Sequence, residues 1–149
     1  MQFGSVEIST PEVMEALGVE IGRRCEPGLQ IRLIGDLGAG KTTLVRGIAA
    51  GLGVTAPIAS PTYAIVEDHG ALVHVDWYRI ESEIELDAID FDAYLEGSGV
   101  VVVEWADKYP HRLDDDSLTI EIAATNGPRR VTASGNQDIA RQFADVFTT

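Results

Sequence analysis

A run of glycines that ends in a lysine and a threonine carries the clearest chemistry in this sequence. Residues 35–42 read GDLGAGKT, which fills every fixed position of the spacing G-x-x-x-x-G-K-[ST]. Because glycine has no Cβ atom, successive backbone N–H groups in such a loop can turn inward around phosphate oxygens. The spacing therefore predicts a phosphate-binding loop, with a glycine-rich turn that binds nothing as the alternative.

Each position of this loop has an expected contact. Lys41 is expected to bridge the β- and γ-phosphates of a nucleoside triphosphate, and the Thr42 hydroxyl to coordinate Mg²⁺. The remaining residues would surround the phosphates with backbone and small side chains. The predicted cofactor-binding residues of the loop are Gly35, Asp36, Leu37, Gly38, Ala39, Gly40, Lys41, Thr42 and Thr43.

The flanks of the loop support this interpretation. Residues 29–34 are mostly apolar and predict a strand, whereas the apolar residues of 44–52 recur at helical spacing and end between two glycines. A helix in this place points the positive end of its dipole at the bound anion. Strand, loop and helix therefore follow one another in the order that phosphate binding requires.

Two carboxylates follow apolar runs and are candidates for the metal and for water. LVHVD ends in Asp76 and VVVVE ends in Glu104. We assign the metal to Glu104, because its unbroken β-branched run is typical of a central strand buried on both faces, beside the strand that feeds the loop. Asp76 is then expected to orient the attacking water. The reverse assignment stays open, as does an ordinary strand-end role for each acid.

Fewer signals single out the remaining polar candidates. SPTYAIVEDH follows the loop's helix and precedes a strand, as a γ-phosphate-sensing loop would, and Thr62 is the candidate contact there, with turn capping as the alternative. His74 is expected to be an ordinary hairpin histidine, with packing beside the site as the alternative. Surface ion pairing is the expected role of each basic residue that could clamp a charge, namely Arg79, Lys108, Arg129 and Arg130.

The elements that position these residues alternate between helix and strand. The pattern predicts one α/β domain over residues 1–149, in which helices flank a mixed sheet. The first helix is expected to open on a capping box of Ser9 and Glu12, with Val13 on its buried face. The other predicted elements are a hairpin over 62–79, a helix over 83–95, a strand over 100–105, a strand pair over 117–134 and a closing helix around 139–146.

Charge and hydropathy exclude several classes of protein. Eleven basic and 24 acidic residues give a formal charge of -13, whereas direct binding of DNA or RNA usually needs a basic face. The acidic runs predict a solvated surface, with docking of a basic partner as the alternative. Apolar runs are far shorter than the ~20 residues of a membrane span, and the start of the chain lacks a signal-peptide pattern. A cytoplasmic location without membrane contact is expected.

Four segments together resemble a known family. They are GDLGAGKTTLVRGIAAGLG, SPTYAIVEDH, HVDWYRI and VEWADK, in this order and within a short chain. They resemble the bacterial TsaE/YjeE family, the ATPase subunit of tRNA threonylcarbamoyladenosine biosynthesis. The similarity spans roughly residues 9–132, and the last three segments are more selective than the first, which many nucleotide-binding proteins share.

The resemblance implies a compact P-loop fold, ATP with Mg²⁺ as cofactors, and a cytoplasmic role. It implies that the protein binds the TsaB–TsaD pair, which modifies adenosine 37 of tRNA, and that ATP hydrolysis lets this assembly turn over again. The tRNA would be reached only through these partners, in agreement with the acidic composition.

Family roles carry over to the positions that match. The resemblance implies that Glu104 binds the metal and that Asp76 is the acid near the γ-phosphate, and Trp105 matches the tryptophan beside the metal acid. Residues implied less directly are Thr10, Lys108 and Arg130, since the family uses its N-terminal and C-terminal segments around the nucleotide, while Lys41, Thr42 and Thr62 keep the roles given above. Trp77 and Ala106 depart from the family's usual leucine and proline, which bears on local packing.

Two other functions stay open from the residues alone. A small-molecule kinase of the P-loop class would share the loop, although little of the chain is left for an acceptor pocket and a lid. A nucleotide-dependent assembly module with negligible hydrolysis is the other alternative. The residues do not reveal which base is bound.

Overall fold

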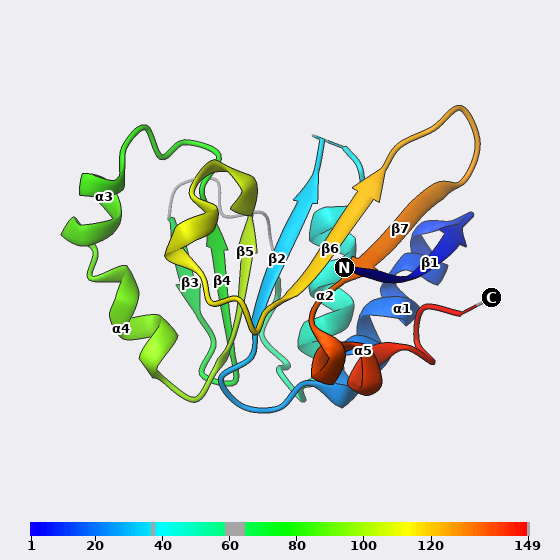
Figure 1. Ribbon diagram of the computed structural model, residues 1–149, viewed down its shortest axis with the longest axis horizontal. Coiled ribbons are helices and arrows are strands. Elements are labelled where there is room, and N and C mark those ends of the chain that lie inside the picture. The colour runs from blue at the N-terminus through cyan, green and yellow to red at the C-terminus, as the bar shows by residue number, and fades with distance from the viewer. Residues whose placement is uncertain (37, 59–64, 149) are drawn as a thin grey trace.

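A computed structural model describes residues 1–36, 38–58 and 65–148, and its strands form one sheet of seven within that part of the chain (Figure 1). The strands are β1 (Gln2–Ile8), β2 (Gln30–Gly35), β3 (Val66–Asp68), β4 (Leu72–Asp76), β5 (Val100–Glu104), β6 (Leu118–Ala123) and β7 (Arg129–Ser134). The helices are α1 (Pro11–Arg24), α2 (Lys41–Gly51), α3 (Glu83–Ala88), α4 (Phe91–Glu96) and α5 (Gln137–Phe143), with 3-10 turns η1 (Ala106–Lys108) and η2 (Pro110–Arg112).

The sheet is mixed, as predicted, and its parallel strands lie at the centre. The order is β1-β7-β6-β2-β5-β4-β3. β2 runs parallel to β5 and β6, and β4 runs parallel to β5. Toward the two edges of the sheet the pairs β1–β7, β6–β7 and β3–β4 are antiparallel. Every residue of β5 is buried, which confirms that the VVVVE run is a central strand beside β2. The carboxyl ends of β2, β4 and β5 therefore meet at one edge of the sheet.

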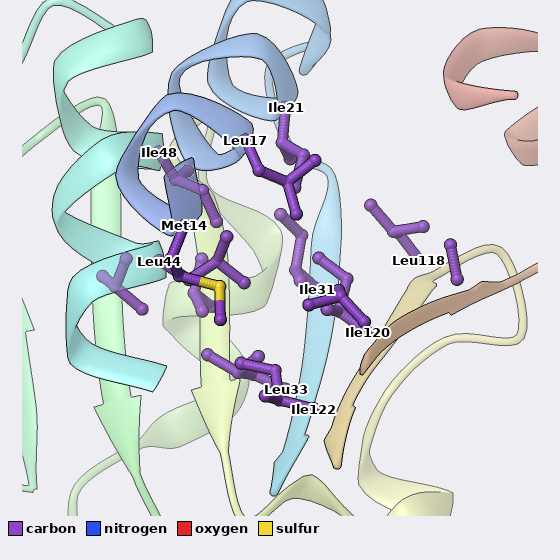
Figure 2. Close-up of a cluster of buried hydrophobic side chains, with 14 of the residues drawn as sticks. Met14, Leu17, Ile21, Ile31, Leu33, Leu44, Ile48, Leu118, Ile120 and Ile122 are labelled. Carbon is purple, nitrogen blue, oxygen red and sulfur yellow. The ribbon is translucent and has the colours of Figure 1, made fainter. Parts of the chain in front are cut away.

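Helices cover the two faces of the sheet unequally. Val100 and Val102 of β5 belong to a core cluster with α1 and α2, whereas the alternating Val101 and Val103 belong to a second cluster with α3 and α4. Figure 1 shows α3 and α4 beside the β3–β5 side of the sheet and α1, α2 and α5 toward the other side. Figure 2 shows the first cluster filling the space between α1, α2 and the strands β2 and β6.

Glycines let α1 and α2 approach closely. A Cβ added at Gly18 of α1 would lie 2.3 Å from the carbonyl oxygen of Leu44, and one added at Gly47 of α2 would lie 2.1 Å from that of Glu15. Real Cβ atoms do not come this near to backbone, so each helix needs glycine where the other crosses it. This contact anchors α2, whose first residue is Lys41.

We expect Gly47→Ala to destabilise the fold by about 1–3 kcal/mol or more, because the new methyl group must push two backbones apart. For a chain of this size that corresponds to a fall in Tm of roughly 2–4 °C per kcal/mol. Thermal and urea unfolding measure the effect. Gly127→Ala is the matched control, since nothing lies within 4 Å of its added Cβ. Equal stability of the Gly47 variant and the wild type would contradict the prediction.

The start of α1 differs from the prediction. Thr10, not Ser9, is the N-cap, and its hydroxyl accepts a hydrogen bond from the N–H of Val13. Met14 is buried at 2% exposure while Val13 is 43% exposed, so Met14 takes the first position of the buried stripe in place of Val13. The helix begins one residue later than a Ser9 cap requires. Among the described residues no helix is long and apolar enough to cross a membrane.

The predicted helix over 83–95 is two helices with a break at Asp90. Asp90 has φ 53°, a left-handed conformation that Asp tolerates better than most residues. Leu86 and Phe91 are both fully buried in the second cluster, whereas Ile84 is 76% exposed. In one helix, five residues turn through about 500°, so Leu86 and Phe91 would not share a face. The break turns Phe91 onto Trp77, with ring centroids 5.4 Å apart.

Part of the acidic surface is neutralised within the fold. Arg112 of η2 forms ion pairs with Glu83 and Asp87 of α3 and with Asp92 of α4, at 3.5, 3.1 and 3.3 Å. Its side chain is only 14% exposed, and its ion pairs fasten the two short helices to η2. Several acids of this region therefore have a structural role.

The strand β1 was not expected from the sequence. It pairs antiparallel with β7, more than a hundred residues away, and forms an edge of the sheet. Its register shifts between Gln2 and Gly4. Phe147 packs against Gly4, and a Cβ at Gly4 would lie 2.7 Å from the Phe147 Cβ. The pairing depends on a partner from the other end of the described chain, which local sequence does not reveal.

Candidate nucleotide-binding site

The loop between β2 and α2 has the backbone that its glycines predict. Gly38 and Gly40 have φ values of 79° and 110°, and residues other than glycine rarely adopt this backbone conformation. Gly40 is the N-cap of α2 and supplies no side-chain cap, so the first N–H groups of this helix are available for an anion. Thr42 and Thr43 lie in the first turn of α2. Leu37 lies outside the described residues.

Lys41 is held inside the loop. Its side chain is buried, with 6% of the residue exposed, and its Nζ donates to the carbonyl oxygens of Gly35 and of Asp36, the latter at 3.0 Å. The ammonium also lies 4.6 Å from the ring centroid of Trp105. Burial lowers the pKa of Lys41, and attraction from nearby carboxylates partly opposes that shift. The ammonium of Lys41 is thus held inside the loop that is predicted to bind phosphate.

The two predicted carboxylates lie side by side. Asp76 ends β4 and Glu104 ends β5, and the two residues are direct partners in the parallel register. Glu104 is 3% exposed and also pairs with Leu33 of β2, so it lies next to the strand that enters the loop. Asp76 is partly exposed and its Oδ1 accepts a hydrogen bond from the N–H of Tyr78 at 2.9 Å.

Burial raises the pKa of the Asp76 carboxyl. The N–H of Tyr78 opposes this rise, whereas the charge of Glu104 adds to it. Two neighbouring carboxylates that are both partly removed from water repel each other, so one of them holds its proton more firmly. A bound cation would relieve this repulsion.

We therefore expect Asp76→Asn to stabilise the nucleotide-free protein at neutral pH, by about 1 kcal/mol or less. The folded-state pKa lies above the unfolded-state pKa, so wild-type stability is lost as the pH rises through the folded-state pKa. Asparagine does not ionise and keeps the acceptor for Tyr78. Urea unfolding at neutral pH and below the ordinary carboxyl range measures the gain, which should disappear at the lower pH. A variant less stable than wild type at neutral pH would contradict the expectation.

His74 is part of this site, although the sequence predicted an ordinary hairpin histidine. It is fully buried, and its Nε2 lies 2.5 Å from Oε2 of Glu104. His74 and Asp76 are two residues apart on β4, so their side chains leave the same face of the sheet. The spacing H-x-D carried that signal, but the contact with Glu104 depends on how β4 and β5 are paired.

Trp105 follows Glu104 in a left-handed conformation with φ 60°. Its indole contacts the ammonium of Lys41, and its ring centroid lies 5.0 Å from that of Tyr78. A bulky residue with positive φ is uncommon and often marks a functional site. The structure therefore brings Trp105 next to Lys41 of the phosphate loop.

A cavity of about 250 Å³ adjoins the loop. It is lined by the start of α1, by residues 38–40 and Thr43, and by residues 127–129. Thr10 lines this cavity, although its hydroxyl is used as the cap of α1. The cavity therefore opens directly beside the loop residues Gly38, Ala39 and Gly40.

Of the two neighbouring arginines of β7, the predicted Arg130 lies away from the cavity. The guanidinium of Arg130 pairs with Glu7 at 2.7 Å on β1, and the neighbouring Arg129 lines the cavity instead. Arg129 donates to the carbonyl oxygens of Gly38 and Ala39, both at 3.2 Å, so it ties β7 to the loop. Adjacent residues of a strand point to opposite faces, and the sequence could not say which arginine faces the loop.

Lys108 supports the backbone beside the site. Its Nζ donates to the carbonyl oxygens of Tyr78, at 3.2 Å, and of Ile80. The ammonium therefore holds the segment after β4 in place. Thr62 lies outside the described residues.

Comparison with known proteins decides the family. The model of the family described as Threonylcarbamoyl adenosine biosynthesis protein TsaE matches residues 8–132. The chain belongs to the TsaE family. Its similarity to TsaE proteins covers most of the chain, and the family is named for the same pathway that the sequence resemblance indicated.

Individual TsaE relatives agree with this. The tRNA threonylcarbamoyladenosine biosynthesis protein TsaE of Bacillus subtilis (strain 168) is 38% identical over 134 residues, covering 85% of this chain and 84% of that protein. The protein of the same name from Streptomyces coelicolor is also 38% identical over 134 residues, covering 82% and 90%. The crystal structure of YdiB from Bacillus subtilis matches with a TM-score of 0.81 at 29% identity, covering 98% of this chain and 95% of that one. The predicted P-loop α/β fold is confirmed.

Three of the four TsaE-like segments meet at one edge of the sheet. The phosphate loop follows β2, Asp76 ends β4 and Glu104 ends β5, and these strands are parallel neighbours. The fourth segment begins at Ser60, and residues 59–64 lie outside the described part of the chain. Two of the three selective segments, HVDWYRI and VEWADK, thus begin on β4 and β5, the next two strands beyond the strand that leads into the phosphate loop.

Proposed function

We propose that this TsaE-family protein is a Mg²⁺-dependent ATPase that supports tRNA threonylcarbamoyladenosine synthesis by binding a TsaB–TsaD-type complex and resetting it. One observation carries the hydrolytic part of the proposal. Asp76 and Glu104 are paired at the ends of parallel strands, beside a loop that stores the buried cation Lys41. A module that only binds nucleotide has no need of two adjacent carboxylates at this place.

The donor set fits Mg²⁺, a hard cation that prefers oxygen ligands and is usually held by few protein groups together with phosphates and water. The Thr42 hydroxyl and the Glu104 carboxylate would hold it, in agreement with the sequence prediction. When bound, Mg²⁺ neutralises charge that develops on the phosphate oxygens. The alternative in which Asp76 binds the metal predicts a different phenotype for its variants.

The other residues of the site act on the triphosphate and on water. The N–H groups at the start of α2 bind phosphate oxygens, and the ammonium of Lys41 moves from the carbonyls of Gly35 and Asp36 to the β- and γ-phosphates. Asp76 orients the attacking water and accepts its proton. Burial raises the pKa of Asp76, which makes its carboxylate a better proton acceptor than an exposed one.

The cavity beside the loop is the proposed nucleoside subsite. Thr43, Thr10 and Arg129 are among the residues that line it. Family membership supports adenosine as the nucleoside. The contacts of Arg129 to the carbonyls of Gly38 and Ala39 would keep the loop shaped around the phosphates.

The charge of the chain supports an indirect relation to tRNA. A formal charge of -13 repels phosphates, so tRNA is held by the partner proteins and not by this subunit. Membership of a tRNA-modification family supports a cytoplasmic location for the protein.

ATP hydrolysis by the purified protein, alone and with a TsaB–TsaD pair, tests the proposal, with threonylcarbamoyladenosine on tRNA followed in the same reactions. We expect slow hydrolysis alone, stimulation by the pair, and several rounds of modification per complex. Hydrolysis that ignores the pair, with no gain in modified tRNA, would overturn the role in modification and favour a small-molecule kinase. Modification supported without any hydrolysis would favour the assembly module.

A further inference from the structure

His74 contacts Glu104, but the proposed function gives His74 no role. In the parallel register His74 faces Val102, two residues before the pair formed by Asp76 and Glu104. The side chain of Glu104 therefore reaches back along β5 to meet the imidazole, and Nε2 of His74 lies 2.5 Å from Oε2. Both residues are removed from solvent, at 0% and 3% exposure.

Burial makes this contact consequential for Glu104. A buried carboxylate needs hydrogen-bond donors, since leaving it without them costs free energy that water would otherwise supply. An ionised carboxylate only accepts, so Nε2 of His74 carries the hydrogen in this contact. The hydrogen bond engages Oε2 and fixes the direction in which the carboxylate points.

A purely structural role explains His74 poorly. The residues before and after it, Leu72, Val73 and Val75, are all buried and apolar. Among the described residues Nδ1 of His74 has no hydrogen-bond partner, so the imidazole is only half satisfied. Burying such a group costs stability that another valine would avoid. The contact with Glu104 is what the imidazole provides at this position.

We propose that His74 is a positioning residue: its Nε2–H holds Oε2 of Glu104 so that the carboxylate serves the Mg²⁺ of a bound nucleotide through its other oxygen. The proposal rests on the proposed function above. Outer partners of metal-binding side chains restrict their orientation, and their loss typically weakens metal affinity or activity by about 10–100-fold. We expect an effect of this order from the loss of the His74 donor.

Two amide variants separate this role from packing. The amide nitrogen of His74→Gln can take the place of Nε2, whereas that of His74→Asn reaches only to the place of Nδ1. The readout is the ratio of the Kd for ATP in EDTA to the Kd in excess Mg²⁺, measured by calorimetry. In the asparagine variant we expect this ratio to be lower than in the wild type by about 10-fold or more. If the wild-type ratio is itself small, it should fall to one, which means that Mg²⁺ no longer strengthens ATP binding. The glutamine variant should stay within a few-fold of wild type, and the Kd in EDTA should be unchanged in both.

Two controls exclude a general loss of structure. Val102→Ala removes core contacts at the neighbouring register position and should keep the wild-type ratio, whatever its Tm. In the Glu104→Gln background, His74→Asn should cause no further fall in the ratio, because His74 acts through Glu104. Thermal unfolding of every variant is followed in parallel, and His74→Leu, which suits the apolar strand, replaces the asparagine variant if that does not fold.

The outcomes separate the two proposals. A wild-type ratio in His74→Asn, or an equal loss in the glutamine and asparagine variants, would overturn the role of His74 and leave the ATPase proposal intact. A wild-type protein that binds no ATP, or binds it equally with and without Mg²⁺, would overturn both.

Discussion

Lys41→Ala is expected to lose ATP binding by about 30-fold to several thousand-fold, which ordinary titration would record as little or no binding. The lysine is 6% exposed and stores its ammonium inside the phosphate loop, 4.6 Å from the ring of Trp105. Truncating one partner of a buried charge pair costs about 2–5 kcal/mol, from which the range follows at about 1.4 kcal/mol per factor of ten. Calorimetric titration with ATP in Mg²⁺ measures it.

Arg46→Ala is the matched control for this experiment. Arg46 lies on the exposed side of α2, five residues after Lys41, so the variant removes one positive charge from the same helix. We expect it to bind ATP like the wild type. Tight binding by the Lys41 variant would contradict the role of the loop, and an equal loss in both variants would point to net charge as the cause.

Asp76→Asn is expected to lower the rate of ATP hydrolysis by about 10²–10⁴-fold while the nucleotide stays bound, the range for loss of a positioned acid or base. The carboxylate lies beside Glu104, and its raised pKa suits proton acceptance. Single-turnover hydrolysis together with calorimetric binding separates the chemical step from affinity.

The exposed acid Asp68 of β3 supplies the control, since Asp68→Asn removes the same charge from the neighbouring strand. It should hydrolyse ATP like the wild type. Wild-type hydrolysis by the Asp76 variant would refute its catalytic role. Loss of Mg²⁺-dependent ATP binding in Asp76→Asn, with binding retained in Glu104→Gln, would show that the two acids have exchanged roles.

Short stretches of sequence were sufficient for the central part of the site. The spacing around Gly35, Gly40 and Lys41 predicts the loop because glycine conformation and the following helix are local properties. The place of Glu104 beside the loop also followed from the sequence, since an unbroken β-branched run is buried on both faces only at the centre of a sheet. Whether ATP is bound and hydrolysed stays a prediction for the experiments above.

Features that depend on pairing between distant segments were missed or misplaced. The strand β1 forms because β7 lies beside it. Arg129 faces the loop because the register of β7 in the sheet sets which of its side chains point to that side. The helix predicted over 83–95 breaks at Asp90 because Leu86 and Phe91 must enter one cluster with Trp77. Each of these depends on a contact partner that local periodicity does not contain.

The sequence by itself determined the phosphate loop, the α/β class, the two strand-end acids and the family, because each rests on residue types at short or characteristic spacing. The tertiary structure alone decided which groups touch. It set Asp76 against Glu104, placed Nε2 of His74 on Oε2 of Glu104, and turned Arg129 toward the loop and Arg130 away from it. The physical reason is that strand register and sheet order, which join residues far apart in the chain, fix the direction of every side chain at this edge of the sheet.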